Sequence, residues 1–487
     1  MQLADLAAPL TEKKIVGDSQ TEIRGIEYDS RKIEPGFLFA ALRGAKDDGH
    51  SFIPKAISKG AQALLVEIPV ENPAVPQIVV PNSRRALALI ANEFYHRPTE
   101  KLKVIGVTGT NGKTTTTYLV ESILAAAGHK TGIIGTIQYK VGEKSYDCKN
   151  TTPESLDLFR LFDEMVSQDV GACAMEVSSH AIVQGRIQGV LFDTVVFTNL
   201  TQDHLDYHKT MDEYFEAKAK LFTDLPMTKK PVAVVNADDP YGQKLLKRLK
   251  IEARTYGIER GMIQAKNIKM NWKGLSFDAK SPSAAFPVTL KLSGRFNVYN
   301  ALAAIGAGLA LQISTEKIAL GLKNAQHVRG RFEMVDKGQD FAVIVDYAHT
   351  PDGLLNVLKS ARELTKNRLI AVFGCGGDRD RTKRPIMGKI AEEHSDIIVL
   401  TSDNPRTEDP RSIIREIEKG IAKPVQVEPD RKAAIGIALA LAKSGDTVVI
   451  AGKGHETYQI FRDKTIHFDD KEVAGAFLEP HGATQSS

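Results

Sequence analysis

Short apolar runs alternate with longer segments of helical spacing over most of the chain. Several runs are continuous stretches of Val, Ile and Phe, which is typical of strands buried on both faces of a parallel sheet. Strands of this kind that alternate with helices predict an α/β fold. The runs that we interpret as strands are residues 104–107, 172–177, 194–198, 232–236, 342–346, 369–373, 397–401 and 447–451.

Two segments divide this pattern. His96-Arg97-Pro98-Thr99 precedes a glycine-rich turn, and the basic segment His327-Val-Arg-Gly-Arg331 precedes a new strand. A length of 487 residues at roughly 150 residues per domain also indicates about three domains. We expect domains over residues 1–100, 101–330 and 331–487, and a frayed polar tail at residues 482–487.

Composition narrows the functional classes. Lys and Arg number 64 and Asp and Glu number 60, without a long basic block, which argues against a general nucleic-acid binder. The 42% of apolar residues favours folded cores over disorder. Cys148, Cys173 and Cys375 form no C-x-x-C pair, which indicates a reducing compartment and no structural zinc site. No signal peptide or membrane-spanning run is evident, so we expect a soluble, cytoplasmic protein.

The strongest single motif is a glycine-rich turn between the strand 104–107 and a helical segment at 116–127. It reads Gly109-Thr110-Asn111-Gly112-Lys113-Thr114-Thr115. Backbone N–H groups in such a turn can surround phosphate oxygens, Lys113 can reach terminal phosphates, and the Thr114 hydroxyl can bind Mg²⁺. Val107 stands where the strict P-loop pattern has glycine, and a turn that caps a helix is the alternative. The motif favours a nucleoside triphosphate without indicating the reaction.

Polar side chains follow two further strands. Glu176 comes at a strand's carboxyl end, where ligands bind in open α/β sheets, and could hold Mg²⁺. An ordinary acidic residue at a helix start, with serine caps, fits equally well. After the next strand, two Asp and two His side chains suggest metal or phosphate chemistry, although a solvated loop fits nearly as well. These four are Asp203, His204, Asp206 and His208.

Lys218 lies in a segment of helical spacing in which Tyr214, Leu221 and Phe222 face inward. The residues alone favour a solvated helical lysine at this position.

Ten short motifs follow one another along the chain. Together they resemble the Mur ligases, which are ATP-dependent amide-forming enzymes of bacterial cell-wall synthesis. The resemblance spans nearly the whole chain and is far more specific than any one motif. The motifs lie at residues 109–114, 176–180, 203–208, 217–218, 294–300, 330–333, 346–351, 374–380, 403–406 and 452–456.

The resemblance implies a domain for each substrate. A smaller N-terminal α/β domain holds the UDP end of the acceptor, a central P-loop domain with a parallel sheet binds ATP, and a C-terminal Rossmann-like domain holds the incoming amino acid. A substrate carboxylate attacks the γ-phosphate of ATP, and the amino group then displaces phosphate from the acyl phosphate. No protein nucleophile is needed, because placement and neutralisation of charge by Lys113 and two Mg²⁺ ions suffice.

The resemblance also implies roles for individual residues around ATP. A lysine at the position of Lys218 carries a carbamate in relatives, which makes it an oxygen ligand for Mg²⁺ beside His204 and reverses the interpretation given above. Taken alone, Asn297 and Asn300 could be helix caps and Arg331 a linker arginine. The catalytic set is Lys113, His204 and Lys218. The metal set is Thr114, Glu176, His204 and Lys218. The nucleotide set is Gly109, Thr110, Asn111, Gly112, Lys113, Thr114, Thr115, Asn297, Asn300, Arg331 and Asp346.

The acceptor implied by the family is UDP-N-acetylmuramoyl-L-alanyl-D-glutamate. From the residues alone, Asn150-Thr-Thr-Pro153 is a turn with free hydroxyls, and Arg186 is either a surface charge or a partner for an acidic substrate. The positions that match the family's acceptor site are Ser30, Asn150, Thr151, Thr152, Ser178, Gln184 and Arg186.

The loop after the strand 397–401 bears on the incoming amino acid. Pro405 fixes one backbone angle, and the Arg406 guanidinium can hold a carboxylate with two hydrogen bonds. In the family, Asp-Asn-Pro-Arg accompanies meso-diaminopimelate, whose second carboxylate lysine lacks. A buried arginine left unpaired can reject a substrate by roughly 10⁴-fold or more. An arginine at the entry of a helix near Pro410 is the alternative. The matching positions are Arg379, Asp403, Asn404, Pro405, Arg406, Gly452 and Glu456.

We therefore expect a monomeric ligase that uses ATP and Mg²⁺ to add meso-diaminopimelate to the UDP-dipeptide in peptidoglycan precursor synthesis, with no nucleic-acid partner and no membrane insertion. The alternatives are the same ligase adding L-lysine, a ligase similar to folylpolyglutamate synthase, and a P-loop switch or scaffold whose nucleotide only controls a partner.

Overall fold

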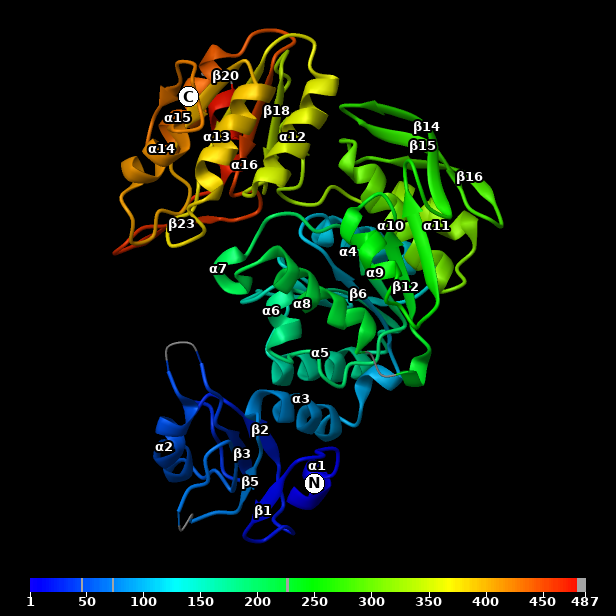
Figure 1. The fold of residues 1–487 in the computed structure, drawn as a ribbon, viewed down its shortest axis with the longest axis vertical. Coiled ribbons are helices and arrows are strands. Elements are labelled where there is room, and N and C mark those ends of the chain that lie inside the picture. Colours follow the sequence, from blue (N-terminus) through cyan, green and yellow to red (C-terminus); the bar gives the residue numbers. More distant parts are fainter. Residues whose placement is uncertain (45–46, 72–73, 225–226, 480–487) are drawn as a thin grey trace, which may run out of the picture.

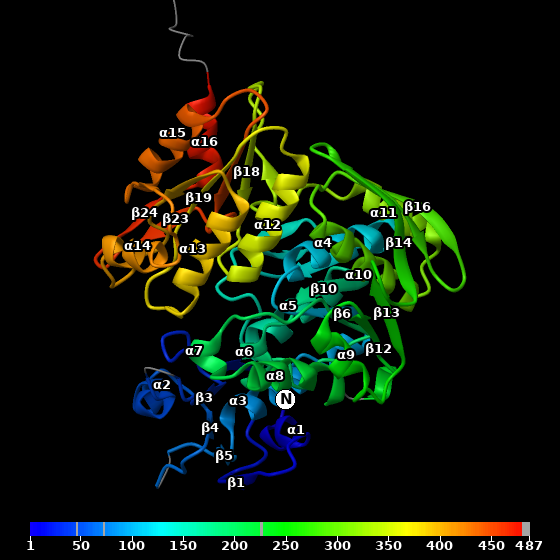
Figure 2. The ribbon, with the colours of Figure 1, turned by 45° about the horizontal axis from the view of Figure 1, so that its top comes forward.

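The computed structural model describes residues 1–44, 47–71, 74–224 and 227–479, and the tail that we expected to fray lies outside them. Three large sheets succeed one another along the molecule, and a small two-stranded antiparallel sheet of β23 (Tyr458–Ile460) and β24 (Thr465–His467) adds to the C-terminal part. The N-terminal sheet lies at one end, the C-terminal sheet at the other, and the largest sheet between them (Figures 1 and 2).

The N-terminal sheet has the strand order β1-β5-β4-β3-β2 and is parallel except at the β1 edge. Its helix α3 packs against α5 of the central part, which joins the two parts (Figure 1). The elements are α1 (Leu3–Ala7), β1 (Lys14–Val16), β2 (Gly25–Glu27), β3 (Phe37–Ala40), α2 (Ile53–Ser58), β4 (Ala63–Val66), β5 (Gln77–Val79) and α3 (Ser83–Phe94), with α5 at Ser155–Ser167.

The central sheet has eleven strands in the order β16-β15-β14-β13-β12-β11-β6-β10-β7-β8-β9. Its middle is parallel and its two margins are antiparallel hairpins. The strands are β6 (Lys103–Thr108), β7 (Thr131–Ile134), β8 (Tyr139–Val141), β9 (Lys144–Tyr146), β10 (Ala172–Glu176), β11 (Thr194–Phe197), β12 (Val232–Asn236), β13 (Ala253–Gly257), β14 (Ile263–Asn271), β15 (Gly274–Lys280) and β16 (Ala285–Leu290).

Helices cover both faces of this sheet, which explains the continuous apolar strands. Val104 faces the core formed with α5 and α8, whereas its neighbour Ile105 faces the core formed with α4, α10 and α11. The helices are α4 (Lys113–Ala126), α6 (Ser179–Val183), α7 (Leu205–His208), α8 (Met211–Thr223), α9 (Pro240–Leu246), α10 (Phe296–Ala310) and α11 (Thr315–Asn324).

The C-terminal sheet has the order β17-β18-β22-β19-β20-β21 and is parallel except at β17. Helices α12 to α14 cover one face and α15 and α16 the other. The elements are β17 (Glu333–Met334), β18 (Ala342–Asp346), α12 (Pro351–Leu364), β19 (Leu369–Phe373), α13 (Lys383–His394), β20 (Ile397–Leu400), α14 (Pro410–Glu418), β21 (Gln426–Val427), α15 (Arg431–Leu441), β22 (Thr447–Ala451), β23 (Tyr458–Ile460), β24 (Thr465–His467) and α16 (Asp470–Leu478).

The predicted α/β class is confirmed, and each predicted strand is present within a residue of its expected end. Each large sheet lies within one of the three expected segments, and the domain boundaries themselves stay predictions. The helix expected at 116–127 begins earlier, at Lys113, because the left-handed Gly112 ends the turn directly before it. Within the described residues, no helix has the length and apolar character needed to cross a membrane.

Candidate active site

One cleft of about 1250 Å³ brings together loops of the central and C-terminal parts. It lies at the carboxyl ends of β6, β10, β11 and β18, where parallel sheets bind ligands. The residues expected from the sequence that line it are Thr110, Asn111, Gly112, Lys113, Thr114, Thr115, Asn150, Thr151, Thr152, Glu176, Ser178, Gln184, Arg186, His204, Lys218, Asn300, Arg331, Asp346, Arg379, Arg406 and Glu456.

The phosphate loop has the shape that the motif predicts. Gly109 and Gly112 have φ angles of +149° and +84°, and a side chain at either position would collide, with the Thr198 hydroxyl and the Asn300 amide respectively. The Lys113 ammonium donates to the carbonyls of Gly109 and Thr110 at 3.0 and 2.8 Å. Burial lowers the pKa of Lys113. The loop thus holds a cation against backbone groups at the start of α4.

Glu176 ends β10 as a buried carboxylate, 1% exposed. It accepts hydrogen bonds from the Thr114 hydroxyl at 3.1 Å and from the backbone N–H and hydroxyl of Thr136 at 2.9 and 3.1 Å. Carboxylate and hydroxyl oxygens are the ligands that Mg²⁺ prefers, so this pair fits the expected ion. Thr136 follows β7 as a single threonine, and no sequence signal distinguishes it.

The four Asp and His side chains after β11 do not form a metal cluster. His208 is buried with Nε2 2.9 Å from the Ser179 hydroxyl, while His204 lies 3.3 Å from the Asp203 carboxylate. Throughout the part of the chain that the structure describes, no three His, Cys, Asp or Glu side chains are grouped to hold a metal. A cation bound near these four side chains would need further oxygen ligands, such as phosphate and water.

Lys218 is buried, and the interpretation as a solvated lysine is wrong. Helix α8 turns Tyr214, Lys218 and Phe222 toward the same interior, since residues four apart share a helix face. The Lys218 ammonium donates to the Gly109 carbonyl at 2.8 Å and lies 4.7 Å from the Tyr214 ring centroid. Burial, together with the charge of Lys113, lowers its pKa well below the usual value. Lys218 is thereby favoured as a neutral amine.

His204 stands beside this lysine. Its backbone is left-handed, with φ +56°, at the start of α7, and its ring packs edge-on against His180 and Tyr214 at 5.0 and 6.0 Å. Burial in the cleft lowers the pKa of His204. A neutral imidazole keeps a nitrogen lone pair that can accept a hydrogen bond or bind a metal.

Asn297 and Asn300 lie inside α10, so the interpretation as helix caps is wrong. The Asn300 side-chain amide donates to the side-chain oxygen Oδ1 of Asn297 at 2.8 Å, and the Asn297 side-chain amide donates to the Ser293 backbone carbonyl at 2.6 Å. Asn300 lines the cleft beside Gly112, whereas Asn297 lies behind it and orients it.

Arg331 is more than a linker arginine, because it connects the C-terminal part to the phosphate loop. Its guanidinium donates to the Thr114 hydroxyl at 3.0 Å and lies 4.5 Å from the Tyr347 ring centroid. Asp346, at the end of β18, accepts from the N–H groups of Phe332 and Ala348 at 2.6 and 2.7 Å. Burial raises the pKa of Asp346 to about 6.

A second contact between the same two parts was missed by the sequence analysis. The Asn111 amide donates to the Asp352 carboxylate at 2.6 Å, across 241 residues of chain. Asp352 lies in the first turn of α12, which the Thr350 side chain caps. An acidic residue after a capping threonine reads as ordinary helix chemistry, so the sequence offers no sign of this contact.

The residues of the central part that we expected at the acceptor site form one connected wall of the cleft. The Thr152 hydroxyl donates to the Glu176 carbonyl at 2.8 Å, and Arg186 donates to the Thr152 carbonyl at 2.9 Å. The side chain of Ser178 caps α6. Arg186 therefore faces the cleft and is not a surface charge. Ser30 is buried in the turn after β2 of the N-terminal part, outside the residues that line the cleft.

Two guanidinium groups and a carboxylate line the C-terminal side of the cleft: Arg379, Arg406 and Glu456. The Asn404 amide and the Lys453 ammonium both donate to one Glu456 carboxylate oxygen, at 2.8 and 2.9 Å. Asn404 thus supports Glu456 from behind. Asp403, Pro405 and Gly452 belong to the same supporting layer rather than to the cleft lining, with Gly452 next to the Asp403 carboxylate.

Lys453 was missed, although it lies within the motif at 452–456. Its side chain is fully buried, and its ammonium also donates to the side-chain oxygen Oδ1 of Asn404 at 3.1 Å.

Comparisons with known proteins agree with this geometry. Three family models match successive segments: "Mur ligase family, catalytic domain" at residues 22–95, "Mur ligase middle domain" at 107–308, and "Mur ligase, glutamate ligase domain" at 330–454. The UDP-N-acetylmuramoyl-L-alanyl-D-glutamate--2,6-diaminopimelate ligase of Geobacillus kaustophilus is 48% identical over 490 residues, which cover 99% of this chain and 100% of the relative.

Solved structures give the same picture. A structure of UDP-N-acetylmuramoyl-L-alanyl-D-glutamate--2,6-diaminopimelate ligase superposes with a TM-score of 0.69, at 31% identity and over 98% of both chains. The MurF ligase from Thermotoga maritima in complex with ADP shares the fold, with a TM-score of 0.66 and 20% identity over 90% of this chain and 95% of that one.

Proposed function

The chain belongs to the Mur ligase family and is an ATP-dependent ligase, and we propose that it adds meso-diaminopimelate to UDP-N-acetylmuramoyl-L-alanyl-D-glutamate in peptidoglycan precursor synthesis. The observation that carries this proposal is the pair of guanidinium groups of Arg379 and Arg406, which line the same cleft as the phosphate loop. The names of the relatives support the same substrates.

The nucleotide site of the proposal is built around the phosphate loop. The ATP phosphates lie along the loop at the start of α4, where backbone N–H groups and the Lys113 ammonium balance their charge. Thr114, Glu176, His204 and a modified Lys218 would hold Mg²⁺, which would neutralise phosphate oxygens. Asn300 and Arg331 line the cleft next to this loop, with Asn297 and Asp346 supporting them.

The reaction needs only placement of three substrates. An oxygen of the acceptor's glutamate carboxylate attacks the γ-phosphorus of ATP, and ADP leaves. The amino nitrogen of the incoming amino acid, after losing its proton, then attacks the acyl carbon, and phosphate leaves as the amide forms. The positive groups on the cleft wall keep the two anionic reactants close together, which is the main requirement of phosphoryl transfer.

Lys218 supports this placement as a carbamate. Its neutral amine nitrogen bonds to the carbon of CO₂ and releases one proton. The product is a carbamate, so an anionic oxygen ligand takes the place of the neutral amine. The burial that lowers the pKa of Lys218 keeps the amine available for this reaction. His204, 6.0 Å from the Tyr214 ring that Lys218 also contacts, completes this side of the cleft.

We also propose three domains with boundaries near residues 100 and 331. The first holds the UDP end with Ser30, and the wall of Thr152, Ser178 and Arg186 holds the middle of the acceptor. The expected cytoplasmic location and monomeric state stay predictions.

Recognition of the amino acid follows from charge. The two carboxylates of meso-diaminopimelate match the guanidinium groups of Arg379 and Arg406, and one of its ammonium groups matches Glu456, whose second oxygen is not engaged by Asn404 or Lys453. Lysine has one carboxylate and would leave a guanidinium unpaired, which costs binding energy.

Phosphate release tests the reaction class. Purified protein with ATP and Mg²⁺ should release phosphate only when both the UDP-dipeptide and meso-diaminopimelate are present, and mass spectrometry should identify the UDP-tripeptide. Phosphate release with a folate in place of the UDP-dipeptide would favour the folylpolyglutamate-like alternative. No ATP consumption with any combination of acceptor and amino acid would favour the switch or scaffold.

A further inference from the structure

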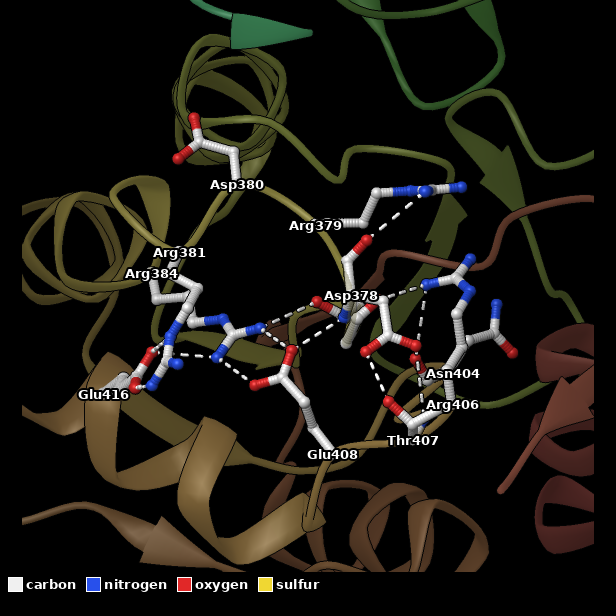
Figure 3. A network of polar contacts seen from close by, with 12 residues as sticks. Asp378, Arg379, Asp380, Arg381, Arg384, Asn404, Arg406, Thr407, Glu408 and Glu416 are labelled. Carbon is white, nitrogen blue, oxygen red and sulfur yellow. Dashed lines mark hydrogen bonds and ion pairs between the residues drawn. The ribbon is translucent and has the colours of Figure 1, made fainter. Parts of the chain in front are cut away.

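A buried arginine on α13 lies beneath the two loops that carry Arg379 and Arg406. Arg384 is fully buried, and its guanidinium holds both carboxylate oxygens of Glu408, at 2.8 and 2.9 Å. The same guanidinium donates to Glu416 at 2.8 Å and to the Gly376 carbonyl at 3.2 Å. Figure 3 shows Arg384 between the two glutamates, with Arg379 and Arg406 on the other side of the network.

Glu408 connects this arginine to the loop that follows β19. Its carboxylate also accepts the backbone N–H of Asp378 at 2.7 Å. Asp378 has a left-handed backbone, with φ +54°, which a non-glycine residue adopts only when its surroundings hold it. The Asp378 carboxylate in turn accepts from the Thr407 hydroxyl at 2.6 Å. The pKa of Glu408 is lowered to about 2 by its pairing with Arg384, so the link stays charged in the working pH range.

The same two loops fix the Arg406 side chain. Its guanidinium donates to the Gly377 carbonyl at 2.8 Å, and the Gly377 N–H donates to the Asn404 carbonyl at 2.9 Å. Arg406 itself is left-handed, with φ +53°. The position of the Arg406 guanidinium therefore depends on the position of Gly377. Gly377 directly precedes Asp378, whose backbone N–H is bound by Glu408.

We propose that Glu408, fixed by Arg384, is a positioning residue that sets where the Arg406 guanidinium meets the distal carboxylate of the incoming amino acid. This inference rests on the proposed function. The Glu408 carboxylate accepts two guanidinium N–H groups and a backbone N–H. These charge-assisted bonds tie the loop to a buried side chain and so hold it in one place.

Glu416 supplies a matched control. It pairs with the same Arg384, but its other partner is Arg381 rather than the loop residues 376–378 or 405–407. Loss of either glutamate charge weakens the buried arginine's pairing, whereas only loss of the Glu408 charge also weakens the hydrogen bond to the Asp378 N–H. Glu408→Gln and Glu416→Gln therefore separate the positioning role from general support of Arg384.

Steady-state kinetics of the full-length variants test the inference. Glu408→Gln should raise KM for meso-diaminopimelate about tenfold, since small displacements of a positioning group have effects of this size. KM for ATP and for the UDP-dipeptide should stay within about twofold, and Glu416→Gln should leave all three KM values within about twofold. An equal rise of all three KM values in Glu408→Gln, or the same selective rise in Glu416→Gln, would overturn the inference.

A double variant makes the test specific to Arg406. If Glu408 acts through Arg406, then Glu408→Gln should add nothing to KM for meso-diaminopimelate in an Arg406→Ala background, because coupled sites are not additive. If the KM increases of the two single variants multiply in the double variant, the positioning role is overturned and the proposed function is left intact. An unchanged KM in Arg406→Ala alone would instead overturn the proposed recognition, and the inference with it.

Thermal melting checks that the variants fold. If Glu408→Gln does not fold, Thr407→Val is the second variant. It removes the hydroxyl hydrogen bond to Asp378 and leaves only the 3.3 Å bond from the Thr407 backbone N–H. It should raise KM for meso-diaminopimelate selectively by about threefold. A Thr407→Val variant with unchanged KM values would then overturn the inference.

Discussion

Burial changes the chemistry of Lys218. A surface lysine is a cation, whereas this one lies against Tyr214 and the Gly109 carbonyl with a strongly lowered pKa. A neutral amine inside an anion-binding cleft is a poor charge neutraliser but a good nucleophile toward CO₂. The position therefore makes chemical sense as a modified residue.

Lys218→Ala should reduce kcat by about 100-fold or more, because the variant lacks an oxygen ligand next to the transferred phosphate. Added bicarbonate should not restore activity. The control is Lys220→Ala on the exposed face of α8, which should retain activity. Wild-type turnover in Lys218→Ala would remove the carbamate from the account.

Arg406→Ala should raise KM for meso-diaminopimelate by about 10- to 100-fold, since a charge-assisted hydrogen bond contributes roughly 1.5–3 kcal/mol. KM for ATP should change little, because the phosphate loop is held by other residues. Arg415→Ala, an exposed arginine on the nearby helix α14, is the control in the same kinetic assay. Equal rises of both KM values would argue against a direct contact.

Individual site residues could be predicted from the sequence where the backbone conformation or close packing allows only one residue type. Gly109 and Gly112 tolerate no side chain, so the phosphate loop could be predicted from them. The helical spacing of Tyr214, Lys218 and Phe222 also indicated that Lys218 is buried, but lysine side chains are usually exposed, which favoured the opposite prediction. When the spacing of a residue predicts burial and its type predicts exposure, only the tertiary fold shows which prediction is right.

On the C-terminal side of the cleft, a second buried arginine connects two helices and two strand ends. Arg431, on α15, pairs with Asp470 of α16 through two contacts of 2.7 Å, and both side chains are fully buried. Its guanidinium also donates to the Ser402 and Ala451 carbonyls, which follow β20 and end β22. One side chain thus holds together two strand ends that support the site.

Arg431→Met should destabilise the C-terminal part by about 3–5 kcal/mol, because Asp470 is left as an unpaired buried charge. Chemical denaturation measures this. The control is Lys389→Met, which breaks a pair whose side chains are 70% and 52% exposed and should cost less than about 1 kcal/mol. Equal losses in the two variants would contradict the role of the buried pair.

Asp346, at the end of β18, gives a pH-dependent prediction. Burial raises its pKa from 3.8 to about 6, so the folded state binds this proton more tightly than the unfolded state. Its contribution to stability is complete below about pH 4 and is lost as the pH rises through about 6. The melting temperature of Asp346→Asn relative to the wild type should therefore increase from about pH 4.5 to about pH 7.5. Asp340→Asn, an exposed change, should show no such trend, and a flat difference for Asp346→Asn would contradict the prediction.

The strands could be predicted from the sequence because burial on both faces requires continuous apolar runs, as at 369–373. Contacts such as Asn111 with Asp352 could not. Each of these residues fits its own loop or helix without the other, and 241 residues separate them. Thr136 and Lys453 were missed for the same reason, since their roles come from partners supplied by distant segments.

On the scale of the whole molecule, the cleft exists only because the central and C-terminal parts meet. Arg331 reaches the Thr114 hydroxyl across 217 residues, and Asn111 reaches Asp352. The proposed sites for ATP, the acceptor and the amino acid would therefore be contributed by different parts of the chain. In the proposed function, the choice of the incoming amino acid is decided at Arg379, Arg406 and Glu456, on the C-terminal side of the cleft.

The most direct test is the ratio of kcat/KM for meso-diaminopimelate to that for L-lysine, measured by phosphate release from purified enzyme with saturating ATP, Mg²⁺ and UDP-dipeptide. The account predicts that meso-diaminopimelate is favoured by roughly 10⁴-fold, because lysine leaves a guanidinium unpaired. A kcat/KM for L-lysine equal to or above that for meso-diaminopimelate would contradict it.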